Sequence, residues 1–407
     1  MKADQILHTL LWEEENIPLI TSLRADLIKR LFRYLDQLKW AIQKDTSIQG
    51  EEFLSLISKL NADELDKFIK GSLISEHLRN FSCSDHKKVI NKLLPYLKAQ
   101  LGSRDVLGQW TSNSEYYLAP QAHTHPPAQK DHINKGDSDY WYTLGTIENC
   151  YLNPKTKNGE IIVDFDSFAT RKDEPESGIL AGKFHPFSAK QKEKIFSKID
   201  EALGILRIYC PAAFNLITVY TQTIRVRKRD GESFGSEQVP REIGSIRLSN
   251  THLDEVNPLI LAESIVHESV HNFLSCYEYL YETFSFSYEK NCQARPISPW
   301  SDNAIPHASF THAICVYFAI YNFLQKIPQN DSNKLFIRQR LLACSSGFMQ
   351  GIPITEYILK IGDTPSHIAG MFLKMQELVI RKENQAQKSI QGVNPRALFR
   401  NYYLKGA

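Results

Sequence analysis

The chain of 407 residues is 42% hydrophobic and 23% charged, and its formal net charge is only +2. This composition is typical of a folded globular protein, and so small a net charge argues against binding to nucleic acid or to a membrane surface. No apolar run reaches the roughly 18 residues that a membrane-spanning helix requires, and the seven cysteines form no CxxC pair, so we expect a cytoplasmic protein without a disulfide framework or a cysteine zinc site.

Residues 1–118 are expected to form a helical N-terminal region. Four leucines there are spaced four residues apart and so form one apolar stripe on a helix: Leu23, Leu27, Leu31 and Leu35. The next segment, residues 119–139, is rich in Pro, Gly, Asn and Asp, a composition typical of a polar loop or linker. Residues 140–407 are then expected to form an α+β catalytic domain.

The first half of that domain carries the strand signals. Residues 214–229 are rich in β-branched and aromatic side chains, and the segments 160–168 and 244–250 also have the character of strands. Between them, Ser188 begins a predicted helix that runs to residue 206. The apolar spacing is helical again in four later segments, 258–281, 308–325, 332–347 and 365–383. We therefore predict an α+β fold that is mainly helical, with a small β-sheet in the middle of the chain.

An HExxH motif, His267-Glu268-Ser269-Val270-His271, lies within the predicted long core helix 258–281. Residues four apart share one face of a helix, so both imidazoles can bind one metal ion, with Glu268 beside them. Apolar residues form a stripe next to this face, which places the histidines at the edge of a buried surface. A core helix with two hydrogen-bonded histidines would show the same pattern, and that interpretation stays open.

Catalytic zinc sites and non-haem iron sites usually have three protein ligands, so the two histidines need a third. A downstream glutamate would make the site a gluzincin, and the chain offers Glu278, Glu282 and Glu289. Glu278 lies only seven residues beyond His271, which is too close for that arrangement. The chain has Leu and Tyr where the extended metzincin motif requires Gly and His, which excludes that class.

His312 is the better candidate for the third ligand. It lies on the apolar face of the predicted helix 308–325. A histidine in that position is usually a core residue with a hydrogen-bond partner, but a second helix that brings one histidine to an existing pair would complete a three-histidine site. We prefer it to His307, which lies at the start of the helix and is expected to cap it or to line the entrance of the site.

The order of these segments resembles that of a known family. A strand-like segment, EIGSIRLSN, precedes the motif helix, and SPWSDNAIPHASFTHAICVYFAIYNFL follows it. Over residues 210–385 the chain is similar to the HExxH-motif peptide-modification proteins of ribosomal peptide natural-product pathways. The family's Pro-Trp element corresponds to Pro299-Trp300, and its histidine-bearing helix corresponds to the one with His312. The resemblance implies an iron(II)- and 2-oxoglutarate-dependent hydroxylase that modifies the β-carbon of a residue in a precursor peptide.

The family carries two arginines near the Pro-Trp element, where this chain has Ser301 and Ile305. Arginine suits the distal carboxylate of 2-oxoglutarate because its planar fork donates two charge-assisted hydrogen bonds. We expect Arg340, Arg338 or Arg295, in that order, to replace the missing pair. Arg340 comes first because its predicted helix can pack beside the helix that carries the third histidine.

Three functions are compatible with the sequence. In the first, which the resemblance implies, His267, His271 and His312 bind Fe(II), and Glu268 orients a ligand or a water molecule. The alternative is an HExxH zinc metallopeptidase in which Glu268 is the general base that activates water, since three histidines suit zinc as well as iron. The second alternative is a peptide-binding protein with a structural metal or none, which the loss of the two arginines supports.

Overall fold

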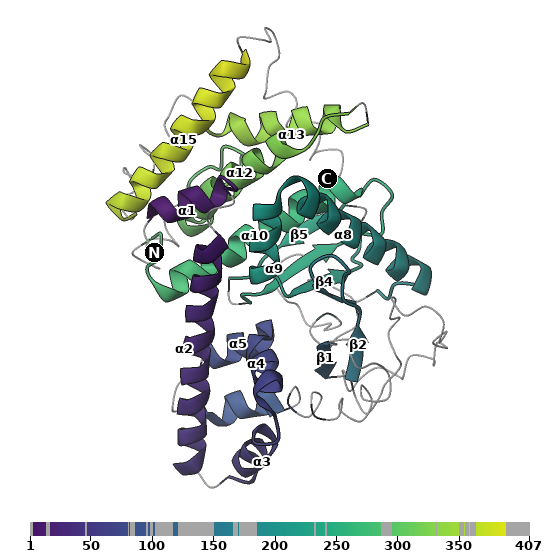
Figure 1. Cartoon of the computed structure of the whole chain (residues 1–407), viewed down its shortest axis with the longest axis vertical. Coiled ribbons are helices and arrows are strands. Elements are labelled where there is room, and N and C mark those ends of the chain that lie inside the picture. Colours follow the sequence, from purple (N-terminus) through teal and green to yellow (C-terminus); the bar gives the residue numbers. More distant parts are fainter. Residues whose placement is uncertain are drawn as a thin grey trace. The chain divides into compact units, whose positions relative to one another are not determined.

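The computed structural model describes residues 3–13, 17–44, 47–79, 81, 86–94, 97, 101, 117–120, 150–165, 170, 185–231, 233–240, 242–285, 295–330, 332–349, 354, 358 and 364–387 (Figure 1). The prediction of a mainly helical α+β fold with a small sheet is confirmed. No helix in the described part of the chain is both long and apolar enough to span a membrane.

The chain divides into two compact units, and each unit is assembled from separate segments. Unit 1 comprises Met1–Leu23, Gly204–Ile217 and Ala262–Ala407, and unit 2 comprises Arg24–Leu203 and Thr218–Leu261. Residues 121–139 of the predicted linker lie outside the described residues. The domain boundaries that the composition indicates therefore stay a prediction.

The N-terminal part of unit 2 is helical, as the leucine spacing predicts. Its helices are α2 (Ile17–Lys44), which begins in unit 1, α3 (Ile48–Ile57), α4 (Ala62–Lys70) and α5 (Ser72–Arg79). All four leucines of the predicted stripe on α2 are buried. Side chains set two of the helix starts: Ser47 accepts the Gly50 N–H at α3, and Asn61 and Glu64 form a reciprocal capping box at α4.

Unit 2 also contains a four-stranded mixed sheet. Its strands are β3 (Ile162–Asp164), β4 (Thr223–Arg227), β5 (Gly235–Glu237) and β6 (Ser245–Ser249). They follow the order β3-β4-β6-β5, in which the first three are parallel and β5 is antiparallel to β6. A separate antiparallel pair consists of β1 (Tyr117–Pro120) and β2 (Cys150–Asn153).

Both faces of the central strands are buried, but the two faces differ in character. On β4 and β6 one face is apolar, with Ile224 paired to Ile246 in register. The opposite face pairs Arg225 with Arg247, and both arginines are buried. The carboxylate of Glu242 accepts a hydrogen bond from each, at 3.0 Å from Arg225 Nη1 and 2.6 Å from Arg247 Nη2. The polar face is therefore built around one carboxylate between two guanidinium groups.

The predicted strand over 214–229 is wrong in its first half. Residues Pro211–Tyr220 form the helix α9, which follows α8 (Ala189–Tyr209), and only Thr223–Arg227 is a strand. Proline is favoured at the first position of a helix because its N–H would be unpaired there. Buried apolar side chains then recur at helical spacing on α9, and their burial outweighs the β-preference of the segment.

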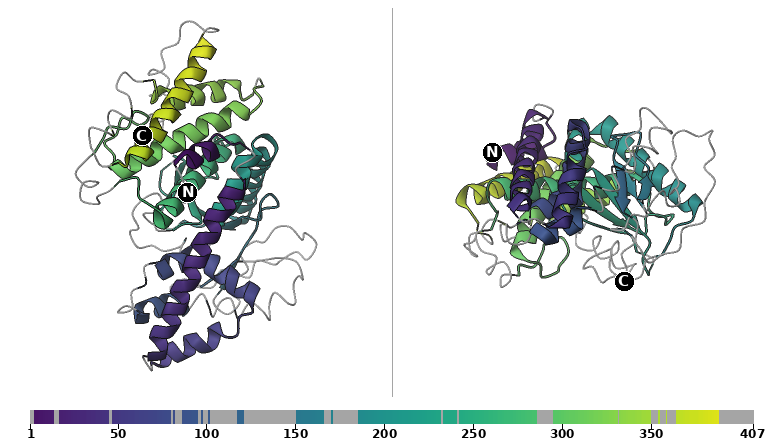
Figure 2. Two further views of the ribbon diagram at one scale, coloured as in Figure 1. Left: turned by 60° about the vertical axis from the view of Figure 1, so that its left-hand side comes forward. Right: turned by 90° about the horizontal axis from the view of Figure 1, so that it is seen from below.

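The helices of unit 1 include one from each end of the chain. Besides the end of α8 and most of α9, they include α1 (Ala3–Leu10), α10 (Pro258–Leu280), which begins in unit 2, α12 (His307–Lys326), α13 (Lys334–Ser346) and α15 (Ser366–Gln387). The last four match the helices predicted from apolar spacing. In Figures 1 and 2, α1 lies against α12 and α15, and the Trp12 indole N–H donates to the carbonyl of Ala319 on α12 at 2.8 Å.

Candidate metal centre

The motif helix α10 begins at a side-chain cap and presents its histidines on one side. Asn257 Oδ1 accepts the backbone N–H groups of Leu259 and Ile260, both at 3.0 Å, and Pro258 occupies the first helical position. The apolar stripe expected beside the histidines is fully buried, and it consists of Ala262, Val266, Val270, Phe273 and Tyr277. Burial of this stripe holds α10 in a fixed orientation, so the histidines are held with it.

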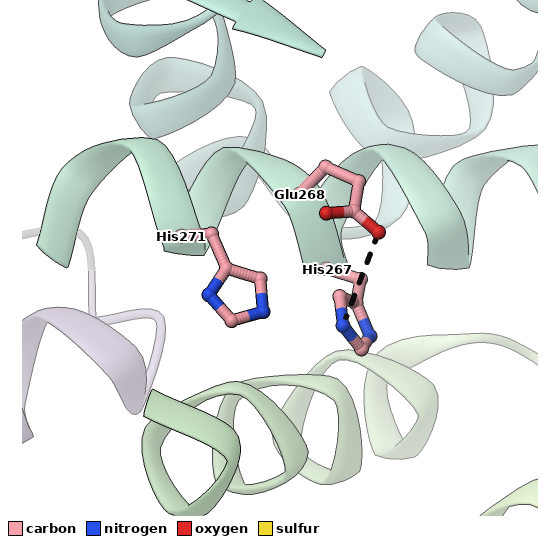
Figure 3. Close-up of side chains that lie close together, drawn as sticks. All are labelled: His267, Glu268 and His271. Atoms are coloured by element: carbon pink, nitrogen blue, oxygen red, sulfur yellow. Dashed lines mark ion pairs between the residues drawn. The ribbon is translucent and has the colours of Figure 1, made fainter. Parts of the chain in front are cut away.

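His267 and His271 project from the same side of α10, toward α12 (Figure 3). Their ring centroids are 5.1 Å apart. With Glu268 they form a group in which one ligating atom from each residue lies within 4.8 Å of the others. The His267 side chain is 29% exposed and that of Glu268 only 4%. The group is therefore accessible from the His267 side, while the carboxylate lies inside the protein.

His312 on α12 lies against the motif. Its Nδ1 atom is 3.2 Å from Nδ1 of His271, and the two rings are stacked with centroids 5.4 Å apart. Two nitrogens that bind one metal ion at about 2.0–2.1 Å, at tetrahedral or right angles, lie about 3 Å apart. The spacing of these two Nδ1 atoms fits such a pair. Among the described residues His312 lies outside the compact group that His267, Glu268 and His271 form, so it stays the predicted third ligand.

Glu278 contacts the far side of the His312 ring. Its Oε2 atom is 2.9 Å from His312 Nε2, and its Oε1 atom accepts the backbone N–H of Phe284 at 2.8 Å. Burial raises the pKa of Glu278, but the His312 charge and the two hydrogen bonds outweigh that effect, so this pKa lies below its ordinary value. The carboxylate therefore binds a histidine that is a candidate ligand.

Both motif histidines are held in their neutral form at ordinary pH. Loss of solvation lowers the pKa of His267 to about 4, and the charge of Arg340 adds to the effect. Loss of solvation also lowers the pKa of His271 well below its ordinary value, and repulsion from the neighbouring His267 and His312 lowers it further. Only a neutral imidazole has a free lone pair for a metal ion. The surroundings thus favour the form that can bind one.

Glu268 lies beside the imidazoles at a longer distance. Its Oε1 atom is 3.9 Å from His267 Nε2, whereas two ligands of one metal ion at adjacent positions lie about 3 Å apart. The geometry suits a carboxylate that faces a molecule bound next to the metal better than a carboxylate that binds the metal together with His267.

The three candidate arginines lie in different surroundings. Arg340 on α13 is buried, and its Nε atom donates to both carboxylate oxygens of Glu263, at 2.9 and 3.0 Å, while Nη2 also donates to Oε1. Glu263 precedes His267 by one turn of α10. Arg338 and Arg295 are exposed. Of the three, Arg340 is the one whose charge lowers the pKa of a motif histidine, and its guanidinium is already paired with Glu263.

Two aromatic residues beside the site could not be assigned a place from the sequence. Tyr317 on α12 meets the His267 ring edge to face at 6.0 Å, and Trp300 stacks on Tyr317 at 4.6 Å with the rings nearly parallel. The Trp300 indole N–H donates to the Cys344 carbonyl at 2.9 Å. A Cβ atom at Gly347 would lie 2.3 Å from this indole, so only glycine permits the contact. The Pro-Trp element thus fixes a tyrosine next to His267.

His307 is fully buried at the start of α12, and its Nε2 atom is 3.1 Å from the Thr364 hydroxyl. The structure thus gives it a protein partner other than the motif histidines.

Comparisons with known proteins identify no family for this chain. The sequence matches no family model, and a search of curated proteins finds no significant relative.

Proposed function

We propose that this chain is an iron(II)- and 2-oxoglutarate-dependent hydroxylase that acts on the β-carbon of a residue in a ribosomally made peptide. The observation that carries the proposal is the compact group of His267, Glu268 and His271 on α10, together with His312 of α12, whose Nδ1 atom lies 3.2 Å from that of His271. The resemblance of residues 210–385 to the HExxH-motif peptide-modification proteins supplies the choice of reaction. Such a reaction on a precursor peptide would take place in the cytoplasm.

His267, His271 and His312 would hold the metal ion, and their donor set fits iron. Iron with 2-oxoglutarate and O2 supplies the oxidising power that breaks an unactivated C–H bond, which acid–base groups alone cannot do. The remaining task of the protein is positioning. Glu268, buried next to His267, would orient a ligand or a water molecule at the metal.

Arg340 stays the first candidate for the distal carboxylate of 2-oxoglutarate. A buried carboxylate without a cation would cost several kcal/mol, and Arg340 is buried close enough to His267 to lower its pKa. Glu263 must then share this guanidinium or release it. Arg338 and Arg295 are less suited because both are exposed.

Two alternatives each have an observation in their favour. A zinc metallopeptidase is favoured by the buried Glu268 carboxylate beside the histidine pair, where a general base would lie. A peptide-binding protein with a structural metal or none is the second alternative, and its metal-free form is favoured by the direct contact between His271 and His312, which is also a satisfactory hydrogen bond.

Metal analysis of protein prepared without oxygen separates the three functions. We expect Fe(II) to bind, and 2-oxoglutarate to produce a visible iron charge-transfer band. Zinc binding without such a band, together with peptide hydrolysis, would favour the peptidase. Protein that binds a peptide but takes up neither metal would favour the binding function.

A further inference from the structure

The contacts of Glu278 determine which nitrogen of His312 carries a proton. A carboxylate accepts hydrogen bonds and has no proton to donate, so the 2.9 Å contact between Glu278 Oε2 and His312 Nε2 requires a proton on Nε2. A neutral imidazole has one N–H and one lone pair. In its neutral form, which metal binding requires, His312 then has its lone pair on Nδ1, the atom that is 3.2 Å from His271.

We infer that Glu278 is a positioning residue that holds the proton of His312 on Nε2 and thereby presents Nδ1 as the metal-binding atom. This inference rests on the metal site of the proposed function. Carboxylates that accept the second N–H of a metal-binding histidine fix both the tautomer and the orientation of its ring. Phe284 adds to the fixed orientation, since it meets the His312 ring edge to face at 5.8 Å.

Direct binding of the metal by Glu278 is the competing interpretation. Seven residues of α-helix separate Glu278 from His271, which places them about 10 Å apart along the axis of α10. The His312 ring spans this gap, with Nδ1 next to His271 and Nε2 next to Glu278. Both carboxylate oxygens also have partners already, because Oε1 accepts the Phe284 N–H. The geometry thus assigns Glu278 to the histidine and not to the metal.

Replacement of Glu278 by glutamine would reverse the proton position. The glutamine oxygen can accept only where a donor faces it, and the backbone N–H of Phe284 is a donor that cannot change. With the oxygen turned toward Phe284, the glutamine NH2 group faces His312 Nε2, which must then be an acceptor. The proton of His312 moves to Nδ1 and blocks the nitrogen that faces His271.

A second contact between a glutamate and a histidine, Glu282 with His367, provides the control. Glu282 Oε1 lies 2.6 Å from His367 Nε2 and accepts from the Tyr277 hydroxyl at 3.0 Å. This pair has the same chemistry, but its side chains are 37% and 52% exposed and neither contacts a motif histidine in the described contacts. Glu282→Gln therefore reproduces the loss of a carboxylate bound to a histidine without touching His312.

The experiment measures the tautomer and the metal affinity separately. In ¹⁵N-labelled, metal-free protein we expect NMR to show the His312 proton on Nε2 in the wild type and on Nδ1 in Glu278→Gln. The affinity for Zn²⁺ alone, measured by competition with a chelator, should fall about 10–100-fold in Glu278→Gln. Glu282→Gln should change it by less than about twofold, since a contact outside the site carries no such effect.

The outcomes distinguish this inference from the proposed function. A wild-type His312 that carries its proton on Nδ1 would overturn the inference even if Glu278→Gln failed to fold. Equal Zn²⁺ affinity of wild type and Glu278→Gln would overturn the role of Glu278 and leave the metal site standing. A wild type that takes up neither Fe(II) nor Zn²⁺ would instead overturn the proposed function, and with it any metal-binding role for His312.

Discussion

Arg340 and Glu263 form a buried pair in which the guanidinium donates to both oxygens of the carboxylate. Such a pair contributes little when compared with a well-packed apolar substitute, but the loss of one partner leaves a buried charge without compensation. The pair joins α13 to the turn of α10 that precedes His267. An intact pair is therefore expected to stabilise the fold, whether or not Arg340 also binds a ligand.

Arg340→Ala should reduce the free energy of unfolding by about 3–5 kcal/mol, because Glu263 would then be a buried, unpaired carboxylate. The double variant Arg340→Ala with Glu263→Ala should recover part of this loss. Urea unfolding followed by circular dichroism measures both. Arg338→Ala, at an exposed position on the same helix, should remain within about 0.5 kcal/mol of wild type. Equal stability of Arg340→Ala and Arg338→Ala would contradict the structural role of the pair.

Alanine substitution of His267, His271 or His312 should abolish metal binding, since each removes one of three ligands. His307→Ala should leave most of it, because the His307 ring is held by Thr364. Metal content after loading with Fe(II) in the absence of oxygen is the measurement. If His312→Ala retained its full metal content, the third ligand would have to come from elsewhere.

Glu268→Gln separates the two candidate enzymes. A peptidase depends on this carboxylate to take a proton from water, and its loss would lower turnover by about 10²–10⁴-fold or more. A hydroxylase takes its oxygen from O2 and needs Glu268 only for orientation, so measurable turnover should remain. The assay follows 2-oxoglutarate consumption and peptide hydrolysis side by side. Complete loss of hydroxylation with iron still bound would show that Glu268 takes part in the reaction.

Among the elements, the helices followed from the sequence more faithfully than the strands. The spacing of apolar residues predicts α10 and α12 to within a residue or two, and both bring their histidines to one place. The segment before β4 shows the limit of this approach. Its β-branched residues indicate a strand, yet the segment forms α9, whose apolar residues are buried at helical spacing, because burial in the folded chain outweighs a weak local preference.

The details of the site depend on contacts that no spacing reveals. Glu278 and His312 lie 34 residues apart in the chain and meet only through the packing of α10 with its neighbours. The sequence indicates Glu278 as a possible ligand, because it lies on the histidine face of the same helix. Its partner becomes evident only from the position of α12. Tyr317 likewise enters the site through its contacts with Trp300 and His267.

The polar face of the sheet in unit 2 supports a prediction of stability. Glu242 lies between Arg225 and Arg247, and all three side chains are buried. Glu242→Gln should therefore reduce the free energy of unfolding by about 3–5 kcal/mol, since two guanidinium groups would lose their common carboxylate.

Glu237→Gln is the matched control, because Glu237 also faces Arg247, at 3.5 Å, but its side chain is 29% exposed. It should cost less than about 1 kcal/mol. Thermal or urea unfolding of the two variants would test the difference, and equal losses would show that the buried triad has no special role.

Helix α5 adds a dependence on pH. Desolvation, aided by Lys92 and opposed by Glu242, lowers the pKa of His77 from 6.5 to about 4. Between these two values the unfolded chain binds a proton that the folded chain does not, so the free energy of unfolding should fall as the pH decreases through this window. His77→Gln should lose less stability than wild type between pH 6.5 and 4. If the free energy of unfolding changed with pH in the same way in wild type and His77→Gln, His77 would not be the source of the pH dependence.

At the scale of the whole molecule, each unit is built from segments that lie far apart in the sequence. Unit 1 holds the candidate metal centre, and it combines α1 with the last helices of the described chain. Local patterns predict the individual helices, but they contain no information on which distant helices share a unit. This is the part of the fold that the sequence alone does not reveal.

The attachment of α1 to α12 has a consequence for synthesis on the ribosome. Trp12 and the carbonyl of Ala319, which it contacts, are 307 positions apart. At a translation rate of about 5–20 residues per second, roughly 15–60 s pass between the appearance of the two. During this time the apolar side chains of α1 and Trp12, all buried in the finished protein, have no α12 to pack against. The nascent chain therefore exposes the apolar side chains of this segment to water until α12 has been made.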